Sequence, residues 1–319
     1  MPWQIEDRAG IWLPQIGWWL DSQRRRHRAF VSHAHADHAA RHSEILCSPA
    51  TARLLRARLP GRRIEHVLPF GQTEPLTTDC AVSLLPAGHI RGSALALLTH
   101  DRHGTLLYTG DFKLRPGLSA EPCATPRADV LVMETTFGRS RYVLPPVSQV
   151  LADIIAFCRS ALADGEVPVL YACSLGKSQE LLCGLAGTGL PVMLHPPAWR
   201  LTRIYAELGV AFPDYRPFVA AESAGHVVIC PPHAAGGRPK GRRGRHRTAI
   251  VSGWAMDPGA IYRYRCDAAF PLSDHADFPD LLRFVAAVQP RLVYTIHGFA
   301  REFAATLRER GIEAWALDR

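Results

Sequence analysis

The sequence predicts an α/β protein with two domains. Its 319 residues are 47% hydrophobic, which is enough to bury a full core, and this length corresponds to about two domains at roughly 150 residues each. Up to Gly138 the chain consists of short strand-like runs between turns, whereas from Val147 onwards helical and strand-like segments alternate. Alternation of that kind favours a parallel sheet.

The expected elements follow from hydrophobic periodicity. In the first part only residues 49–59 are strongly helical, and the expected strands are 29–32, 81–85, 94–98, 106–109 and 130–133. In the second part we expect helices at 147–163 and 179–185, and strands at 168–172 and 248–252. The last part predicts a helix at 279–288, a strand at 292–296, and a closing helix and strand.

The net charge and the cysteine pattern indicate the kind of partner and the cellular compartment to expect. A net charge of +8 favours a polyanionic partner. The eight cysteines include no Cys-x-x-Cys pair, which argues against a cysteine zinc site and fits a reduced, cytoplasmic setting. Because the chain has neither an apolar leader nor a run of about 18 uninterrupted apolar residues, we expect a soluble protein without a membrane segment.

The most informative run is His33-Ala34-His35-Ala36-Asp37-His38, which follows an apolar strand. His33 and His35 alternate on an extended segment, so both rings are expected on one face. Asp37 and His38 follow where the strand turns into a loop. Imidazole and carboxylate groups suit zinc, manganese or iron, and a carboxylate among histidines is typical of hydrolytic sites. A single histidine is ordinarily a core or surface residue, but this clustering favours a metal site.

Two further residues support a metal site at this histidine run. His89 follows a strand in a glycine-flanked turn, and Asp111 ends another strand. With these residues the chain resembles the metallo-β-lactamase superfamily, whose motifs follow in this order and spacing. The resemblance implies an αββα sandwich in which Asp21 orients a ligand. It also implies a first metal on His33, His35 and His89, a second on Asp37 and His38, and Asp111 bridging the two.

Two metal ions suit phosphodiester hydrolysis. Ions about 3.5 to 4 Å apart stabilise both the attacking and the leaving oxygen, and their charge neutralises the transition state. Zn²⁺ is the expected metal and Mn²⁺ the alternative. The same scaffold also hydrolyses thioesters and lactams, so the superfamily alone leaves the substrate open.

Three later segments resemble the additional motifs of the β-CASP nucleases, a branch that inserts a nucleic-acid-gripping domain into the metallo-β-lactamase core. The matching residues are Glu134, His275 and His297, each beside an expected strand end. The resemblance implies that His297 completes the second metal's shell and that His275, held by Glu134, protonates the departing oxygen. Histidine suits proton transfer because its ordinary pKa is near 6.5. Asp37, His275 and Glu134 are thus the expected catalytic residues, and the alternative for Glu134 is an ordinary strand-end carboxylate.

The resemblance also divides the chain. It places the metallo-β-lactamase domain at residues 1–138 and 266–319, with an α/β β-CASP insertion at 139–265. Within the insertion, Ser174 and Lys177 lie at a strand-to-helix turn and would bind a substrate phosphate, or else form a capping turn with an exposed lysine. The basic stretch 236–247 is expected to be an exposed loop, either a phosphate-binding arm or a solvated segment, and we favour contact with nucleic acid.

Over nearly its whole length the chain resembles the short bacterial β-CASP proteins described as DNA ligase-associated exonucleases. That resemblance implies a DNA exonuclease acting in repair, in functional association with a DNA ligase. A β-CASP ribonuclease is the alternative, because His297 matches the RNA-processing branch. A catalytically inactive nucleic-acid-binding factor is disfavoured because no expected ligand is missing, and a small-molecule hydrolase is disfavoured by the insertion and the basic charge.

Overall fold

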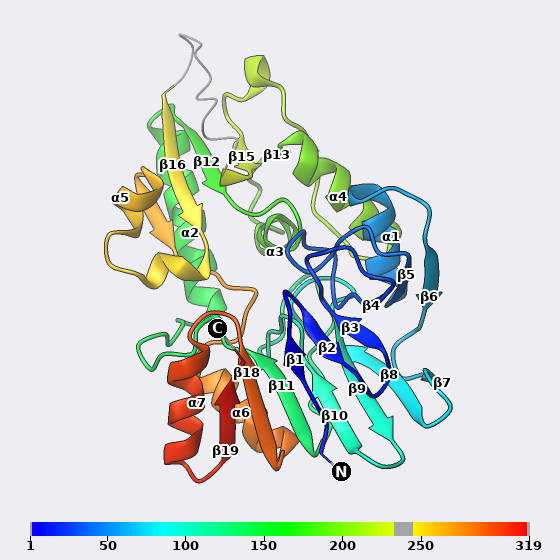
Figure 1. Cartoon of the computed structure of the whole chain (residues 1–319). Coiled ribbons are helices and arrows are strands. Elements are labelled where there is room, and N and C mark those ends of the chain that lie inside the picture. The colour runs from blue at the N-terminus through cyan, green and yellow to red at the C-terminus, as the bar shows by residue number, and fades with distance from the viewer. Residues whose placement is uncertain (1, 233–244, 318–319) are drawn as a thin grey trace. The chain divides into compact units, whose positions relative to one another are not determined.

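The computed structural model describes residues 2–232 and 245–317. The chain divides into two compact units, Met1–Val143 with His275–Arg319, and Leu144–Asp274. We call them the sandwich unit and the inserted unit. The sequence-based expectation for the insertion was residues 139–265. Each unit is α/β and has its own sheets and buried core (Figure 1).

The sandwich unit contains two sheets. The first has the order β1-β2-β3-β4-β5-β6, formed by Glu6–Asp7, Ile11–Leu13, Trp18–Leu20, Arg28–Phe30, Glu44–Cys47 and Ile64–Val67. The second has the order β19-β18-β11-β10-β9-β8-β7, formed by Glu313–Ala316, Leu292–Ile296, Val130–Glu134, Gly104–Tyr108, Ala94–His100, Cys80–Pro86 and Thr73–Pro75. Strands β10, β11, β18 and β19 are parallel, and β7, β8, β9 and β10 pair antiparallel.

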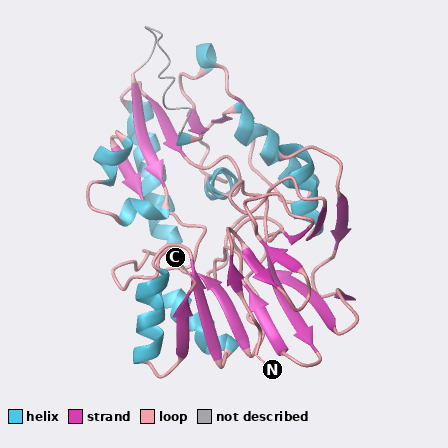
Figure 2. Cartoon of the chain, in the orientation of Figure 1, coloured by secondary structure: helices cyan, strands magenta, loops and turns pink. Residues whose placement is uncertain are grey.

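Alternation along the strands of the second sheet builds two cores. In β11, Val130 and Val132 face the first sheet, whereas Leu131 and Met133 face helices α6 (Phe278–Val288) and α7 (Ala300–Glu309). Successive side chains of a strand point to opposite faces, so one apolar strand supplies both cores. Helix α1 (Pro49–Arg58) packs beside β6 (Figure 2). The unit is the αββα sandwich that the sequence predicted.

The inserted unit is built on one fully parallel sheet. Its order is β14-β13-β15-β12-β16-β17, formed by Tyr215–Pro217, Val192–Leu194, Val227–Cys230, Val167–Tyr171, His246–Val251 and Ala268–Phe270. Its helices are α2 (Val147–Ala163), α3 (Lys177–Gly184), α4 (Pro196–Glu207) and α5 (Ala260–Tyr264), with short 3₁₀ turns η1 (Ala220–Glu222) and η3 (Gly253–Met256). The expected parallel sheet is confirmed.

One expected strand ends early. Strand β4 ends at Phe30, and the residues from His33 to His38 lie in a loop rather than on an extended strand. The backbone N–H of Ser32 donates to the Asp21 carboxylate at 2.7 Å instead of to a neighbouring strand, which ends the pairing. In the part of the chain that the structure describes, no helix is long and apolar enough to cross a membrane.

Candidate metal centre

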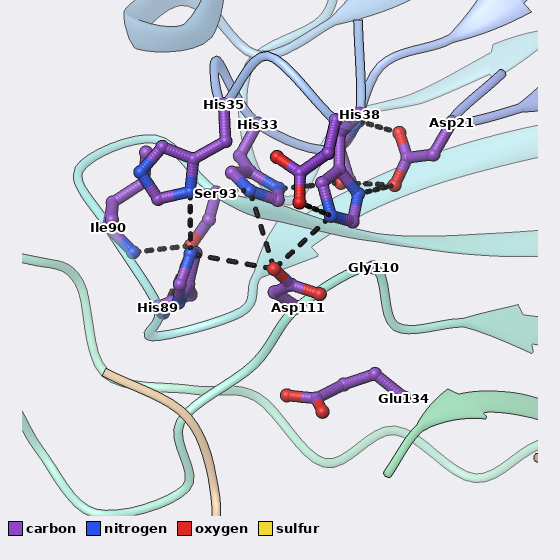
Figure 3. A network of polar contacts seen from close by, with 12 residues as sticks. Asp21, His33, His35, His38, His89, Ile90, Ser93, Gly110, Asp111 and Glu134 are labelled. Carbon is purple, nitrogen blue, oxygen red and sulfur yellow. Dashed lines mark hydrogen bonds and ion pairs between the residues drawn. The ribbon is translucent and has the colours of Figure 1, made fainter. Parts of the chain in front are cut away.

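The expected ligands lie at one edge of the sandwich unit, where Figure 3 shows His33, His35, His38, His89 and Asp111. Strands β8, β10, β11 and β18 run in the same direction, so the residues that follow them share that edge. His89 follows β8, Asp111 follows β10, Glu134 ends β11 and His297 follows β18. The loop after β4 brings the first histidine run to the same place.

Asp111 lies at the centre of the ligand cluster. Its Oδ2 atom is 3.2 Å from Nε2 of His38, 3.6 Å from Nε2 of His33 and 3.8 Å from Nε2 of His89. Nδ1 of His35 lies 3.0 Å from Nε2 of His33 and 3.1 Å from Nε2 of His89. One ligand atom from each of His33, His35, His89 and Asp111 falls within 4.8 Å of the others. Three imidazoles and a carboxylate in this arrangement fit a divalent cation.

Burial and mutual charge set the protonation of this cluster. Burial, together with the neighbouring His38 and His89, holds the pKa of His33 well below its usual value. Burial alone would raise the pKa of Asp111, but the charges of His38 and His275 hold it well below its usual range. A neutral imidazole and an ionised carboxylate are the forms that bind metal ions.

Asp21 holds the cluster from behind. It adopts a left-handed backbone conformation (φ 47°) directly after β3, and its carboxylate accepts hydrogen bonds from four partners. The donors are Ser32 N (2.7 Å), Ser32 Oγ (2.5 Å), His38 Nδ1 (2.9 Å) and Tyr108 Oη (2.9 Å). Because Asp21 engages Nδ1 of His38, Nε2 of that ring faces Asp111. Although burial opposes it, Asp111 and Asp21 raise the pKa of His38 well above its usual value.

Two residues that support Asp21 were not predicted from the sequence, Ser32 and Tyr108. Ser32 contacts Asp21 and also lies 2.9 Å from Nδ1 of His33 through its Oγ. Tyr108 is fully buried, and burial together with Asp21 raises the pKa of its hydroxyl well above the usual value, so it remains a donor. A hydroxyl directly before the histidine run was the available signal for Ser32. Nothing local distinguishes Tyr108 from an ordinary apolar strand residue.

Asp37 and His297 stand at the open side of the cluster. The Asp37 side chain is 69% exposed, and its Oδ2 lies 3.8 Å from Nε2 of His38. His297 is exposed, adopts φ 58°, and its ring centroid lies 5.8 Å from that of His38. The carbonyl of His297 accepts from Thr135 Oγ1 at 2.7 Å, and a side chain at the following Gly298 would overlap the backbone of Thr136. A left-handed non-glycine residue held in this way is typical of a functional position.

Glu134 and His275 form a pair beside the cluster. Glu134 is fully buried, and its Oε1 lies 2.9 Å from Nδ1 of His275. The other oxygen accepts from Thr136 N at 2.8 Å. The His275 ring centroid is 4.7 Å from that of His89. The pair therefore places a carboxylate-held imidazole next to the candidate metal ligands.

The two candidate phosphate-binding residues lie in the inserted unit, after β12. Nζ of Lys177 is buried and lies 2.9 Å from the Asp274 carboxylate. Gly176 N donates to Gln179 Oε1 at 2.7 Å, and Gln179 Nε2 donates to the Ser174 carbonyl at 3.1 Å. These groups already have partners within the unit, and phosphate binding by Ser174 and Lys177 stays a prediction.

The basic stretch is only partly described. Residues 236–244 of it lie outside the described residues. Arg247, at its end, lies in β16, where its guanidinium pairs with Asp164 at 2.5 Å and with Glu166 at 2.7 Å. Arg247 is thus part of an ion-pair network of the inserted unit.

Comparison with known proteins shows which family the chain resembles. Residues 263–317 match the family model described as the Zn-dependent metallo-hydrolase RNA specificity domain, RMMBL. A protein of Opitutus terrae named probable DNA ligase is 65% identical over 99% of this chain, which corresponds to 31% of that protein. The 5' exonuclease Apollo of Rattus norvegicus is 30% identical over 90% of this chain and 54% of its own length. By these similarities the chain resembles the β-CASP branch of the metallo-β-lactamase superfamily.

A further curated relative and a solved structure are also similar to this chain. The transcription termination factor FttA of Pyrococcus horikoshii is 30% identical over 54% of the chain and 28% of its own length. A solved protein of unknown function from Enterococcus faecalis has the same fold, with a TM-score of 0.57 and 13% identity over 86% of this chain and 76% of that one. The chain spans about a third to a half of the length of the first curated relatives that it matches.

Proposed function

We propose that this chain is a two-metal-dependent DNA nuclease of the β-CASP branch that hydrolyses phosphodiester bonds from an end of the strand, in DNA repair. One observation carries the proposal: Asp111 lies among three histidine nitrogens at 3.2 to 3.8 Å, and the Glu134–His275 pair lies beside them. A cation site next to a histidine acid is the combination that phosphodiester cleavage needs.

The proposed ligands divide into two sets that share Asp111. His33, His35 and His89 would hold one ion, and Asp37, His38 and His297 the other. Zn²⁺ is the proposed metal and Mn²⁺ the alternative, because imidazole and carboxylate ligands accept both. When bound, the two cations would supply charge neutralisation at phosphorus and activate water.

The remaining residues act on protons and orientation. Glu134 engages Nδ1 of His275 at 2.9 Å, so the proton for the leaving oxygen would come from Nε2 of that ring. Asp21 engages Nδ1 of His38 at 2.9 Å and thereby directs its Nε2 to the metal side. These support the roles proposed for His275 as general acid and for Asp21 as an orienting residue.

The names of the relatives support DNA as the substrate and cleavage from an end of the strand. The relative with 65% identity is named a DNA ligase, which also supports functional association with a ligase and hence a cytoplasmic repair role. Three relatives are named 5' exonucleases. The alternative is a β-CASP ribonuclease, favoured by His297 and by a family model described as an RNA specificity domain.

The deciding experiment incubates Zn²⁺- or Mn²⁺-loaded protein with 5'-labelled and 3'-labelled DNA and RNA, single and double stranded. Release of mononucleotides from DNA but not from RNA is the expected result, with the Asp37→Ala variant inactive. Internal cuts in RNA alone would support the alternative and refute the DNA proposal. An Asp37→Ala variant with full activity would refute the assignment of the metal ligands.

A further inference from the structure

The loop that follows Asp111 is joined to the segment that follows His275. Ala276 N donates to the Phe112 carbonyl at 2.8 Å. Phe112 N in turn faces Oε1 of Glu134 at 3.4 Å, the same oxygen that engages His275. The backbone next to the proposed general acid is therefore held by the loop that carries the central metal ligand.

Arg115 makes a second connection between these two segments. Its Nε lies 2.8 Å from Asp280 Oδ2, and its Nη2 pairs with Asp277. Asp277 is fully buried and caps the N-terminus of α6, where its Oδ1 accepts from Asp280 N at 3.0 Å. Asp280 is only 2% exposed. The Arg115 guanidinium thus joins two buried carboxylates in the first turn of α6.

This pair of carboxylates needs a cation. Burial and the neighbouring Asp277 raise the pKa of Asp280, while the Arg115 and Arg283 charges oppose that shift. Removing one partner from a buried ion pair leaves an uncompensated charge, so the first turn of α6 has to rearrange when Arg115 is lost. His275 lies two residues before Asp277 and shares that rearrangement.

We infer that Arg115 is a positioning residue that fixes the His275 imidazole against Glu134 by clamping Asp277 and Asp280. The inference rests on the proposed role of His275 as general acid. A displacement of about 1 Å at a reacting group costs on the order of 100-fold in rate. A merely structural Arg115 would instead stabilise the start of α6 and leave the chemistry of the folded enzyme unchanged.

The test compares Arg115→Ala and Arg115→Lys with Arg283→Ala in the full chain loaded with Zn²⁺. Arg283 is the matched control because it also pairs with Asp280, at 2.7 Å, but from an exposed position and without a pairing to Asp277. Five quantities are measured: kcat and KM for DNA, zinc content, the melting temperature, and the Nδ1–H proton resonance of His275, assigned by its absence in His275→Ala.

In Arg115→Ala we expect kcat to fall by about 100-fold with KM nearly unchanged, zinc content to stay at the wild-type level, and the His275 proton signal to be lost or broadened. Arg115→Lys keeps the charge and should recover part of kcat. Arg283→Ala should match the wild type in kcat and in the proton signal.

Unchanged kcat and an unchanged His275 proton signal in Arg115→Ala would overturn the inference. A loss of zinc in parallel with the loss of kcat would also overturn it, because Arg115 would then support the proposed metal ligand Asp111 and not His275. If Arg115→Ala does not fold, Arg115→Lys decides, because a wild-type signal and kcat in that variant contradict the need for the two-carboxylate clamp. If the wild type cleaves no nucleic acid, the proposed function fails, while the His275 signal still tests the clamp.

Discussion

The two sides of the candidate metal centre are built differently. The inner ligand group, His33, His38, His89 and Asp111, is at most 7% exposed. The outer ligand group, Asp37 and His297, is exposed to solvent. Asp37 was predicted from the same run as His33 and His38, and His297 from a later motif, but the structure exposes both of these outer side chains.

The difference lies in what supports each side chain. Nδ1 of His33 contacts Ser32 Oγ at 2.9 Å, and Nδ1 of His38 contacts Asp21 at 2.9 Å. His297, by contrast, is fixed through its backbone, by the Thr135 hydroxyl and a left-handed φ. Supported rings are oriented before a metal arrives, whereas exposed ligands have to be ordered on binding. We therefore expect the inner group to dominate metal affinity.

The largest effect is expected from the inner group. His33→Ala should abolish stable metal binding and reduce nuclease activity by on the order of 10³-fold or more, since the cations supply several kcal/mol of transition-state stabilisation. Metal analysis of the purified variant and a DNA cleavage assay test this. His66→Ala, which removes a half-exposed histidine paired with Glu44, is the control and should keep its metal. If His33→Ala bound as much metal as the wild type, the inner group would not dominate metal affinity.

His275 adjoins the inner group without belonging to it. His275→Ala should lower kcat by roughly 10²- to 10⁴-fold, because a positioned general acid contributes that much. Its metal content should remain close to the wild-type level. Equal metal loss in His275→Ala and His33→Ala would mean that His275 is a ligand. Inductively coupled plasma analysis beside single-turnover cleavage separates the two outcomes.

Within the outer group, loss of His297 should have a partial effect. In His297→Ala we expect metal content to fall from about two ions to about one per chain, with activity reduced by on the order of 100-fold. The ion proposed for His33, His35 and His89 should be retained, because these rings are held by Ser32 and by one another. His27→Ala, another exposed histidine, is the control. Loss of all metal in His297→Ala would contradict the proposed ranking of the ligands.

The next prediction concerns Asp21, whose hydrogen bond to His38 supports the inner group. Asp21→Asn keeps the shape of the side chain but removes its charge and weakens the contact to His38. We expect metal affinity to fall by 10- to 100-fold, as for other partners of metal-binding histidines. Tyr108→Phe removes one donor from the same carboxylate and should have a smaller effect. Metal titration with a competing chelator measures both, and an unchanged affinity in Asp21→Asn would refute the orienting role.

Local patterns predicted most strands of the second sheet. In β9, β10 and β11 alternate residues face two different cores, and three to five consecutive apolar residues make such strands visible in the sequence. The first sheet was harder, because β1, β2 and β3 have only two or three residues each. Periods of two residues cannot be recognised in runs that short.

Long-range partners were beyond local patterns. Tyr108 reaches Asp21 across 87 positions, and Glu134 reaches His275 across 141. The family resemblance indicated the second pair, but spacing alone contains no information on either. The early end of β4 has the same origin, since the carboxylate of Asp21 replaces a strand partner of Ser32.

The smallest expected effect concerns the loop that carries the inner histidines. His42 is buried near the end of that loop, where its Nδ1 faces Arg26 N at 3.1 Å and its Nε2 faces Ala40 N at 3.2 Å. Burial, together with the Arg26 guanidinium, lowers the pKa of His42 to about 4 from its ordinary 6.5. The unfolded chain therefore binds a proton that the folded chain resists, and stability present above pH 6.5 is lost as the pH falls towards 4.

We expect this loss to be on the order of 2 kcal/mol between pH 7 and pH 4.5, measured by urea unfolding of metal-free protein. His42→Gln cannot be protonated in this range and should show a pH dependence that is smaller by that amount. Other groups of the cluster titrate in both proteins and cancel in the difference. An equal pH dependence in the two proteins would show that His42 does not anchor the loop in its neutral form, and the inner group would then owe its order to Asp21 and Ser32 alone.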